Sequence, residues 1–194
     1  MNRRLFLILG AGAGAAAIAV PAAPPRVARA ARPTSQETDL SDIRENWTDF
    51  LPDGADLPSA DAPLSVTKEQ WRERLPADSF RVLFQDGTER AGSSPLDREK
   101  REGVFACRAC DLPLFTSAMK FDSGTGWPSF FTSIPGHLDT SRDFKLILPR
   151  TEYHCVRCGG HQGHVFEDGP APTGERWCNN GVALRFVPRD GSEA

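Results

Sequence analysis

Two pairs of closely spaced cysteines constrain this chain more than any other feature. Cys107 and Cys110 form the first pair, Cys155 and Cys158 form the second, and 44 residues separate the pairs. A spacing of two residues lets a short loop point both thiolates at one metal ion, and two such loops complete a tetrahedral zinc site. Because four thiolates leave no position for water, we expect one structural zinc ion. Two disulfides in place of the metal are the alternative.

The fifth cysteine, Cys178, is left over and predicts thiol chemistry. It lies in the segment Arg176-Trp177-Cys178-Asn179-Asn180. On a strand, side chains two residues apart share a face, so we expect Arg176 beside the thiol. A fixed cation favours the thiolate, which is the form that acts as a nucleophile.

Two of the four histidines, His161 and His164, lie in a glycine-rich tract that follows Cys158. Histidine is the side chain best suited to hand over a proton near neutral pH, and the glycines around both imidazoles suggest a shaped pocket wall. Turn or core histidines, or additional metal ligands, are the alternatives.

A tryptophan between glycines and proline, Trp127, lies in the segment 121–131. Such a loop holds an indole in a rigid and accessible position, which suits an apolar binding wall. Core packing would explain this tryptophan equally well.

The N-terminus predicts an export signal over residues 1–30. Arg3 and Arg4 precede an apolar, Ala/Gly-rich run to Val20, and Ala28-Arg29-Ala30 offers the small residues that a signal peptidase reads. The paired arginines resemble a twin-arginine signal and indicate a periplasmic or otherwise exported protein. The alternatives are an ordinary Sec signal or an uncleaved membrane anchor through residues 5–23.

Charge argues against nucleic acid as a partner. Without the first 30 residues, which carry four arginines and no acid, the chain has 19 basic and 26 acidic side chains, a net charge of −7. Such a surface repels phosphate backbones.

Twin-arginine export carries folded proteins, so zinc could protect the four sulfurs before they reach an oxidising compartment.

Hydrophobic patterning divides the remaining chain in two. Residues 31–63, rich in Pro, Ala, Asp and Ser, are predicted to be a partly disordered linker. In the domain at 64–190 we expect a helix at 67–75, a second short helix at 79–84, and then short strands. The strands are expected at 104–106, 112–115, 145–148, 152–154, 165–166 and 182–187. The predicted fold is mainly antiparallel β, with short helices near its N-terminus. It also contains a pair of zinc knuckles, which are the two loops that carry Cys107 with Cys110 and Cys155 with Cys158.

Four motifs in order and spacing, over about 64–187, resemble the B-type methionine sulfoxide reductases. They are Cys107-x-x-Cys110, the stretch Phe121 to Phe130, Cys158-Gly-Gly-His161-x-Gly-His164-Val-Phe166-x-Asp168-Gly-Pro170, and Arg176-x-Cys178-x-Asn180. The resemblance implies two antiparallel sheets in a β-tent-like fold, with zinc at the end away from the active site. It also implies reduction of the R epimer of methionine sulfoxide, free or in oxidised proteins, as repair after oxidative stress. A thioredoxin-like protein or a small thiol would be the reductant, and a monomer is expected.

Carried over by position, the resemblance assigns roles to seven residues. Cys178 matches the nucleophile and would become a sulfenic acid, and Trp127 matches the indole that holds the substrate methyl group. The supporting residues are His161, His164, Asp168, Arg176 and Asn180. Thr125 stands where many relatives carry a resolving cysteine, so recycling must differ here. Asn179, Gly181 and Glu167 also depart from the usual pattern near the thiol.

Two other functions are less favoured by these residues. A cysteine hydrolase would use Cys178, His164 and Asp168, but no oxyanion loop or nucleophile at a helix N-terminus is apparent. A non-catalytic zinc-knuckle binding module would leave the combination of free thiol, arginine, histidines and tryptophan unexplained.

Overall fold

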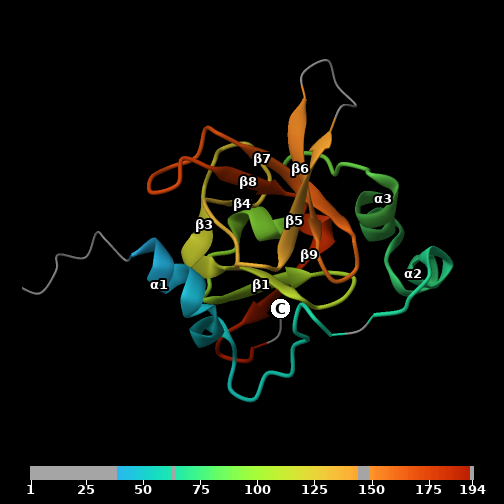
Figure 1. Cartoon of the computed structure of the whole chain (residues 1–194), viewed down its shortest axis with the longest axis horizontal. Coiled ribbons are helices and arrows are strands. Elements are labelled where there is room, and N and C mark those ends of the chain that lie inside the picture. Colours follow the sequence, from blue (N-terminus) through green and yellow to red (C-terminus); the bar gives the residue numbers. More distant parts are fainter. Residues whose placement is uncertain (1–38, 63, 144–148, 193–194) are drawn as a thin grey trace, which may run out of the picture. The chain divides into compact units, whose positions relative to one another are not determined.

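The computed structural model describes residues 39–62, 64–143 and 149–192, and within them the protein is mainly β (Figure 1). Two antiparallel sheets account for the strands, which confirms the predicted fold class. The smaller sheet has the order β2-β1-β9, with β1 at Gly103–Cys107, β2 at Pro113–Thr116 and β9 at Leu184–Pro188. The larger sheet has the order β3-β4-β8-β7-β6-β5. Its strands are β3 (Lys120–Phe121), β4 (Ser129–Phe130), β5 (Leu138–Asp143), β6 (Arg150–Cys155), β7 (His161–Phe166) and β8 (Arg176–Asn179).

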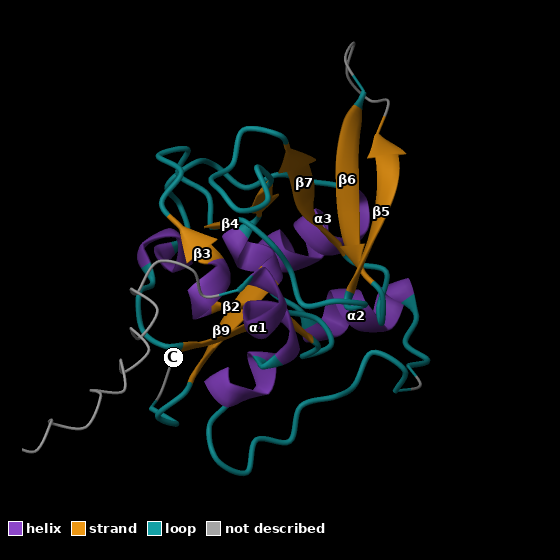
Figure 2. Ribbon diagram, turned by 60° about the vertical axis from the view of Figure 1, so that its left-hand side comes forward, coloured by secondary structure: helices purple, strands orange, loops and turns teal. Residues whose placement is uncertain are grey.

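The helices are short (Figure 2). They are α1 (Leu40–Glu45), α2 (Lys68–Arg74) and α3 (Ala77–Gln85), with 3-10 turns η1 (Trp47–Phe50), η2 (Pro95–Arg98), η3 (Ser117–Met119) and η4 (Gly181–Ala183). The expected capping box is present in α2, where the Thr67 hydroxyl accepts from the Gln70 N–H and the Gln70 side chain accepts from the Thr67 N–H. Helix α3 packs against β7 and η4.

Part of the predicted linker carries helical turns. Helix α1 and η1 fall between residues 40 and 50, and they contact the β domain. Nε of Arg44 donates to Oγ1 of Thr132 at 2.7 Å, and the Trp47 ring lies 5.4 Å from the His137 ring, edge to face. Trp47 therefore packs this segment against the β domain, although the composition of the segment predicted only a linker.

Three of the sequence predictions fall outside the described residues. They are the export signal with its possible anchor, the first part of the linker, and the strand at 145–148. Among the residues that the structure describes, no helix is long and apolar enough to cross a membrane.

The core lies between the two sheets and is built from fully buried aromatic side chains. Phe105 and Phe115 from the smaller sheet meet Phe130 and Tyr153 from the larger one. The Phe115 and Phe130 rings stack at 4.0 Å between centroids. Burying each such side chain stabilises the fold by about 2–3 kcal/mol. With alternate residues of the larger sheet turned into this core, the intervening residues present a second face.

The last strand begins later than the apolar run predicts. The sequence indicates a strand over 182–187, but residues 181–183 form η4 and β9 starts at Leu184. The backbone N–H groups of Gly181 and Val182 donate to the Glu89 carboxylate at 2.6 and 3.0 Å. Glu89, 92 positions before Gly181, thus accepts hydrogen bonds from these two N–H groups. In a strand, such groups would donate to a neighbouring strand instead.

Candidate functional site

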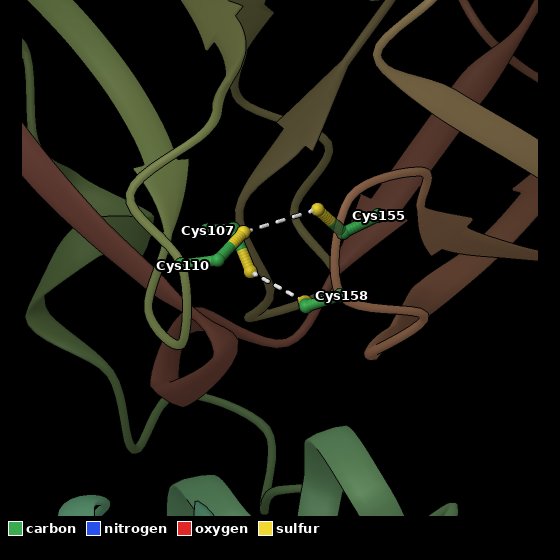
Figure 3. A group of neighbouring side chains, drawn as sticks. All are labelled: Cys107, Cys110, Cys155 and Cys158. Carbon is green, nitrogen blue, oxygen red and sulfur yellow. Dashed lines mark hydrogen bonds between the residues drawn. The ribbon is translucent and has the colours of Figure 1, made fainter. Parts of the chain in front are cut away.

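The four paired cysteines converge on one point, as Figure 3 shows. Sγ of Cys107 lies 3.6 Å from Sγ of Cys158, and Sγ of Cys110 lies 3.5 Å from Sγ of Cys155. All four are free thiols, which excludes the alternative of two disulfides. Four sulfurs around zinc at about 2.3 Å would be about 3.8 Å apart, so the observed cluster fits a tetrahedral ion with small adjustments.

The surrounding backbone and side chains hold this cluster in place. Cys107 ends β1 and Cys155 ends β6, so each pair occupies the turn after a buried strand. Nε2 of Gln162 donates to Sγ of Cys107 at 3.3 Å, and a guanidinium N–H of Arg157 donates to the Cys110 carbonyl at 2.7 Å. Donors aimed at the sulfurs and the loop carbonyls are typical of a structural metal site.

A row of four side chains crosses the larger sheet on the face opposite the core. Cys178 on β8 is directly opposite Ser129 on β4 and His164 on β7, and His164 is opposite Glu152 on β6. Directly opposed residues of antiparallel strands share a face. Gly163 permits this close pairing, because a Cβ there would lie 1.9 Å from the Cys178 carbonyl oxygen.

A small cavity of about 130 Å³ opens on this face. It brings together four of the predicted site residues, namely Cys178, His164, Trp127 and Asn180, with Phe166 and Arg150 also in its wall. An indole and a phenyl ring beside a thiol and an imidazole suit a ligand that combines an apolar group with a polar, reactive atom.

Opposing influences act on the Cys178 thiol. Burial raises the pKa of this thiol above its usual value of 9.0, while the charge of Arg176 and hydrogen bonds with Thr125 and Arg176 lower it. Burial is the largest of these effects, so the resting group is a neutral thiol at neutral pH. The cation expected from the sequence is present, but on its own it does not ionise the sulfur.

Arg176 is itself held from two sides. Its guanidinium donates to both carboxylate oxygens of Asp168, at 2.8 and 2.9 Å, and stacks over the Phe166 ring at 4.3 Å. The Arg176 side chain is 10% exposed, whereas that of Asp168 is 63% exposed. Asp168 therefore orients the arginine that lowers the pKa of the Cys178 thiol, while its own negative charge raises that pKa.

His164 is fixed by a carboxylate that the sequence reasoning did not single out. Its Nε2 lies 3.0 Å from Oδ2 of Asp143, and the same oxygen accepts from Arg150 at 2.7 Å. Burial lowers the pKa of His164, with the hydrogen bond to Asp143 opposing that shift. The ring is therefore neutral near pH 7, which allows it to take up a proton and return it.

His161 lies beside His164 but is almost completely buried. The two rings are 5.4 Å apart, and Nδ1 of His161 lies 2.5 Å from Oε1 of Glu152. Burial lowers the pKa of His161 to about 4, against the opposing charge of Glu152. It is on the same strand as His164, but it pairs with His154 on β6, whereas His164 is directly opposite Cys178 on β8.

Glu89 organises the other side of the cavity, and the sequence carried no signal for it. Its backbone N–H donates to Oδ1 of Asn180 at 3.0 Å, and its carbonyl accepts from the Trp127 indole at 3.3 Å. The Asn180 amide also donates to the Gln162 carbonyl at 3.0 Å. Both polar atoms of Asn180 are thus engaged in holding the cavity wall.

Thr125 faces the nucleophile candidate from the tryptophan loop. Its hydroxyl is close enough to the Cys178 thiol to lower the pKa of that thiol, and its Oγ1 lies 2.8 Å from Oγ of Ser123. Oγ of Ser123 in turn lies 2.8 Å from Oγ of Ser129, the residue opposite Cys178.

Of the site residues that the sequence did not reveal, Glu152 could have been recognised. Strand alternation over residues 152–154 places its side chain on the same face as that of residue 154.

Comparison with known proteins identifies the family to which the domain is similar. The SelR domain model matches residues 75–188. The chain is 48% identical over 130 residues to the peptide methionine sulfoxide reductase MsrB of Pseudomonas putida, covering 66% of this chain and 98% of that protein. It is 47% identical over 119 residues to MsrB of Agrobacterium fabrum, covering 61% of this chain and 88% of that one.

Plant relatives are longer. The chain is 47% identical over 123 residues to the chloroplastic peptide methionine sulfoxide reductase B1 of rice, covering 63% of this chain. The match spans only 58% of the rice protein, less than two thirds of its length.

Proposed function

Since the chain belongs to the SelR family and is a B-type methionine sulfoxide reductase by similarity to the MsrB proteins, we propose that it reduces the R epimer of methionine sulfoxide to methionine. The substrate is the oxidised side chain in proteins or the free amino acid. What supports this proposal most is a single observation, that the one cysteine outside the four-sulfur cluster shares a cavity with His164 and Trp127.

The proposed first step transfers an oxygen atom to Cys178. The Cys178 sulfur, as thiolate, attacks the sulfoxide sulfur while a proton from His164 or His161, directly or through water, converts the departing oxygen to hydroxyl. The hydroxyl is then transferred from the substrate sulfur to the Cys178 sulfur as the substrate S–O bond and the bond between the two sulfurs break, and methionine leaves reduced by two electrons. Cys178 is oxidised by two electrons and retains the hydroxyl as a sulfenic acid.

A neutral thiol in the resting enzyme fits a proton relay through His164. When Nε2–H of His164 is donated to Asp143, Nδ1 is free to take the proton from Cys178 as the substrate enters. The relay then returns this proton to the oxygen. Arg176 favours the thiolate once its proton has left.

Trp127 supplies the proposed recognition of the methyl group. Its indole is half-buried in the cavity wall and is tied to the Glu89 carbonyl. Orientation of the methyl group against this ring would select one epimer, because the mirror arrangement places the oxygen there.

Recycling is proposed to use an external thiol. The four knuckle sulfurs would hold zinc, which supplies a cross-link between two turns and takes no part in the reaction. A thiol of a thioredoxin-like protein or a small molecule attacks the sulfenic acid, releasing water and forming a mixed disulfide. A second thiol then displaces Cys178 and restores it.

A turnover assay tests the function directly. Purified protein is given the R and S epimers separately, as free amino acid and in a peptide, with dithiothreitol as reductant. Methionine should form from the R epimer only, and Cys178→Ser should abolish its formation while zinc content and melting temperature stay unchanged. Retention of a tenth of the activity by this variant would exclude Cys178 as the nucleophile.

Export is a separate proposal that rests on the sequence alone. Arg3 and Arg4 before an apolar run support a periplasmic or otherwise exported protein, with residues 5–23 as a possible anchor. Fractionation of cells expressing the full chain should recover it outside the cytoplasm, and Arg3→Lys combined with Arg4→Lys should retain it inside. Equal export of both forms would contradict the twin-arginine route.

A further inference from the structure

A second group of metal-ligating side chains lies on the larger sheet, separate from the four cysteines. Glu152, His154 and His161 each offer one donor atom, and these atoms all lie within 4.8 Å of one another. Glu152 and His154 are two residues apart on β6, so they share a face, and His161 on β7 is directly opposite His154. Two imidazoles and a carboxylate are typical ligands of zinc and its neighbours in the periodic table.

An irregularity in strand pairing makes this cluster possible. In a regular strand, residues 161 and 164 would point to opposite faces, because their separation is odd. The pairing of β6 with β7 shifts register between Tyr153 and His154, so that His164 pairs with Glu152 and His161 pairs with His154. The rings of His154 and His161 are consequently 5.8 Å apart, and the same carboxylate oxygen of Glu152, Oε1, contacts both of them.

One ligand atom in this cluster is buried without a hydrogen bond among the described residues. Nδ1 of His161 lies 2.5 Å from Oε1 of Glu152, and it has no hydrogen-bond partner in the part of the chain that the structure describes. The His161 side chain is 3% exposed. A buried nitrogen of this kind costs free energy, and a shared cation would satisfy both the nitrogen and the carboxylate.

The distances accept an ion with limited movement. Ligand atoms around a tetrahedral zinc at about 2.0–2.1 Å are about 3.3 Å apart. Nε2 of His154 is already 3.4 Å from Oε1 of Glu152. The shorter 2.5 Å contact with His161 must open by less than 1 Å, which rotation of the Glu152 side chain can provide.

We propose that Glu152, His154 and His161 form a second binding site for a divalent transition metal ion such as Zn²⁺. Three protein ligands leave at least one position for solvent, as in an open zinc site. The His154 side chain is 27% exposed and provides the route by which the ion enters.

A metal ion bound at Glu152, His154 and His161 also affects sulfoxide reduction, and this effect rests on the proposed function. The bound ion takes the Nδ1 lone pair of His161 and places positive charge beside His164, 5.4 Å away between ring centroids. A nearby cation opposes proton uptake by an imidazole. Metal binding therefore inhibits sulfoxide reduction reversibly, and a chelator too weak to strip the four-cysteine site restores it.

The test uses the full protein with zinc already in the four-cysteine site. Co²⁺ is titrated by calorimetry and absorbance, because cobalt bound to nitrogen and oxygen lacks the thiolate charge-transfer bands of a four-sulfur site. Wild type should bind one additional Co²⁺ without those bands. His154→Gln and Glu152→Gln should weaken this binding at least about tenfold. The matched control is His137→Gln, which removes the histidine bound to the Pro113 carbonyl and should bind Co²⁺ as wild type does.

The outcomes separate the metal site from the catalytic proposal. In the absence of added metal, His154→Gln should retain full turnover, and it should resist inhibition by Zn²⁺ concentrations that halve wild-type activity. Binding of only one metal ion per wild-type chain, or unchanged Co²⁺ affinity in both variants, would overturn the proposal whether or not the protein reduces sulfoxides. Zinc content and melting temperature confirm that each variant is folded.

Discussion

The hydroxyl of Thr125 lies close enough to the thiol of Cys178 to lower the pKa of that thiol, although the two residues are 53 positions apart in the chain. The contact brings the loop that carries Trp127 against β8. It also places the position where many relatives carry a resolving cysteine next to the proposed nucleophile.

Replacing this hydroxyl with a thiol should therefore create a two-cysteine enzyme. After one equivalent of substrate, Thr125→Cys should form a disulfide with Cys178 and retain zinc, provided that the two sulfurs reach bonding geometry. Wild type and the control Thr125→Ser should instead give a sulfenic acid that dimedone traps. Mass spectrometry with free-thiol counting distinguishes these products. A disulfide between Cys178 and a knuckle cysteine in wild type, with release of zinc, would mean that the metal site takes part in the redox cycle.

Loss of one knuckle cysteine should remove the metal and destabilise the fold. In Cys155→Ser, a buried three-sulfur cluster no longer fits tetrahedral zinc, and the link between the turns after β1 and β6 is lost. A loss of about 3 kcal/mol corresponds to a fall of about 10 °C in melting temperature. Metal analysis and calorimetry measure both, with Cys178→Ser as the control that keeps zinc. Unchanged zinc content in Cys155→Ser would remove the knuckle interpretation.

The raised pKa of Cys178 predicts a pH profile for alkylation. Because the thiolate is the reactive form, the rate with iodoacetamide should rise about tenfold per pH unit until the pH exceeds 9.0, the ordinary thiol value. Arg176→Met removes a cation that lowers this pKa, so the rate at pH 8 should fall several-fold. Arg185→Met, which breaks a different Arg–Asp pair, serves as the control. An inflection near pH 7 in wild type would show that Arg176 outweighs burial.

Removal of the Trp127 indole should impair binding of the substrate methyl group. An apolar wall for one such group contributes about 1–3 kcal/mol, so kcat/KM for Trp127→Ala should fall about 10- to 100-fold. Trp177→Phe changes a tryptophan that packs against the core on the opposite face, and it should alter stability more than kinetics. Steady-state kinetics on the R epimer and thermal melts measure the two effects. Unaltered kinetics in Trp127→Ala would return this side chain to a packing role.

The Glu89 carboxyl should make the free energy of unfolding depend on pH. Glutamine at this position should remove that dependence. Burial raises the pKa of this carboxyl above its usual value of 4.5, against hydrogen bonds from Gly181 and Val182. The folded state therefore holds the proton more tightly than the unfolded state, and this contribution is present below pH 4.5 and lost as pH rises through the folded pKa.

The comparison of wild type with Glu89→Gln isolates this contribution. The difference in unfolding free energy, wild type minus variant, should decrease as pH rises from 4 to 7. Glutamine keeps one oxygen, so one of the two N–H groups loses its acceptor at a cost of about 1–3 kcal/mol, but that cost does not vary with pH in the same way. Denaturation at several pH values measures the difference, and Glu102→Gln, an exposed residue paired with Arg189, is the control. A difference that stays constant across this range would contradict the assigned shift.

Local chemistry was readable from the sequence because it depends on neighbours in the chain. The spacing of Cys107 with Cys110 and of Cys155 with Cys158 predicts the metal cluster, and Thr67 with Gln70 predicts the start of α2. Each of these features forms within a few residues, so that a short motif specifies it. The leftover thiol, the nearby arginine and the mainly β architecture followed from similar local patterns.

Contacts between distant segments were decided by the tertiary structure. Glu89 binds the start of the last apolar run and delays β9 to Leu184, a register shift turns His161 and His164 to one face, and Thr125 approaches Cys178 from another loop. No local pattern encodes these positions, since each depends on which strands become neighbours and on how deeply they are buried. The state of the thiol illustrates the difference. The sequence identified the cation of Arg176 that favours ionisation, whereas only packing determined that burial would outweigh it.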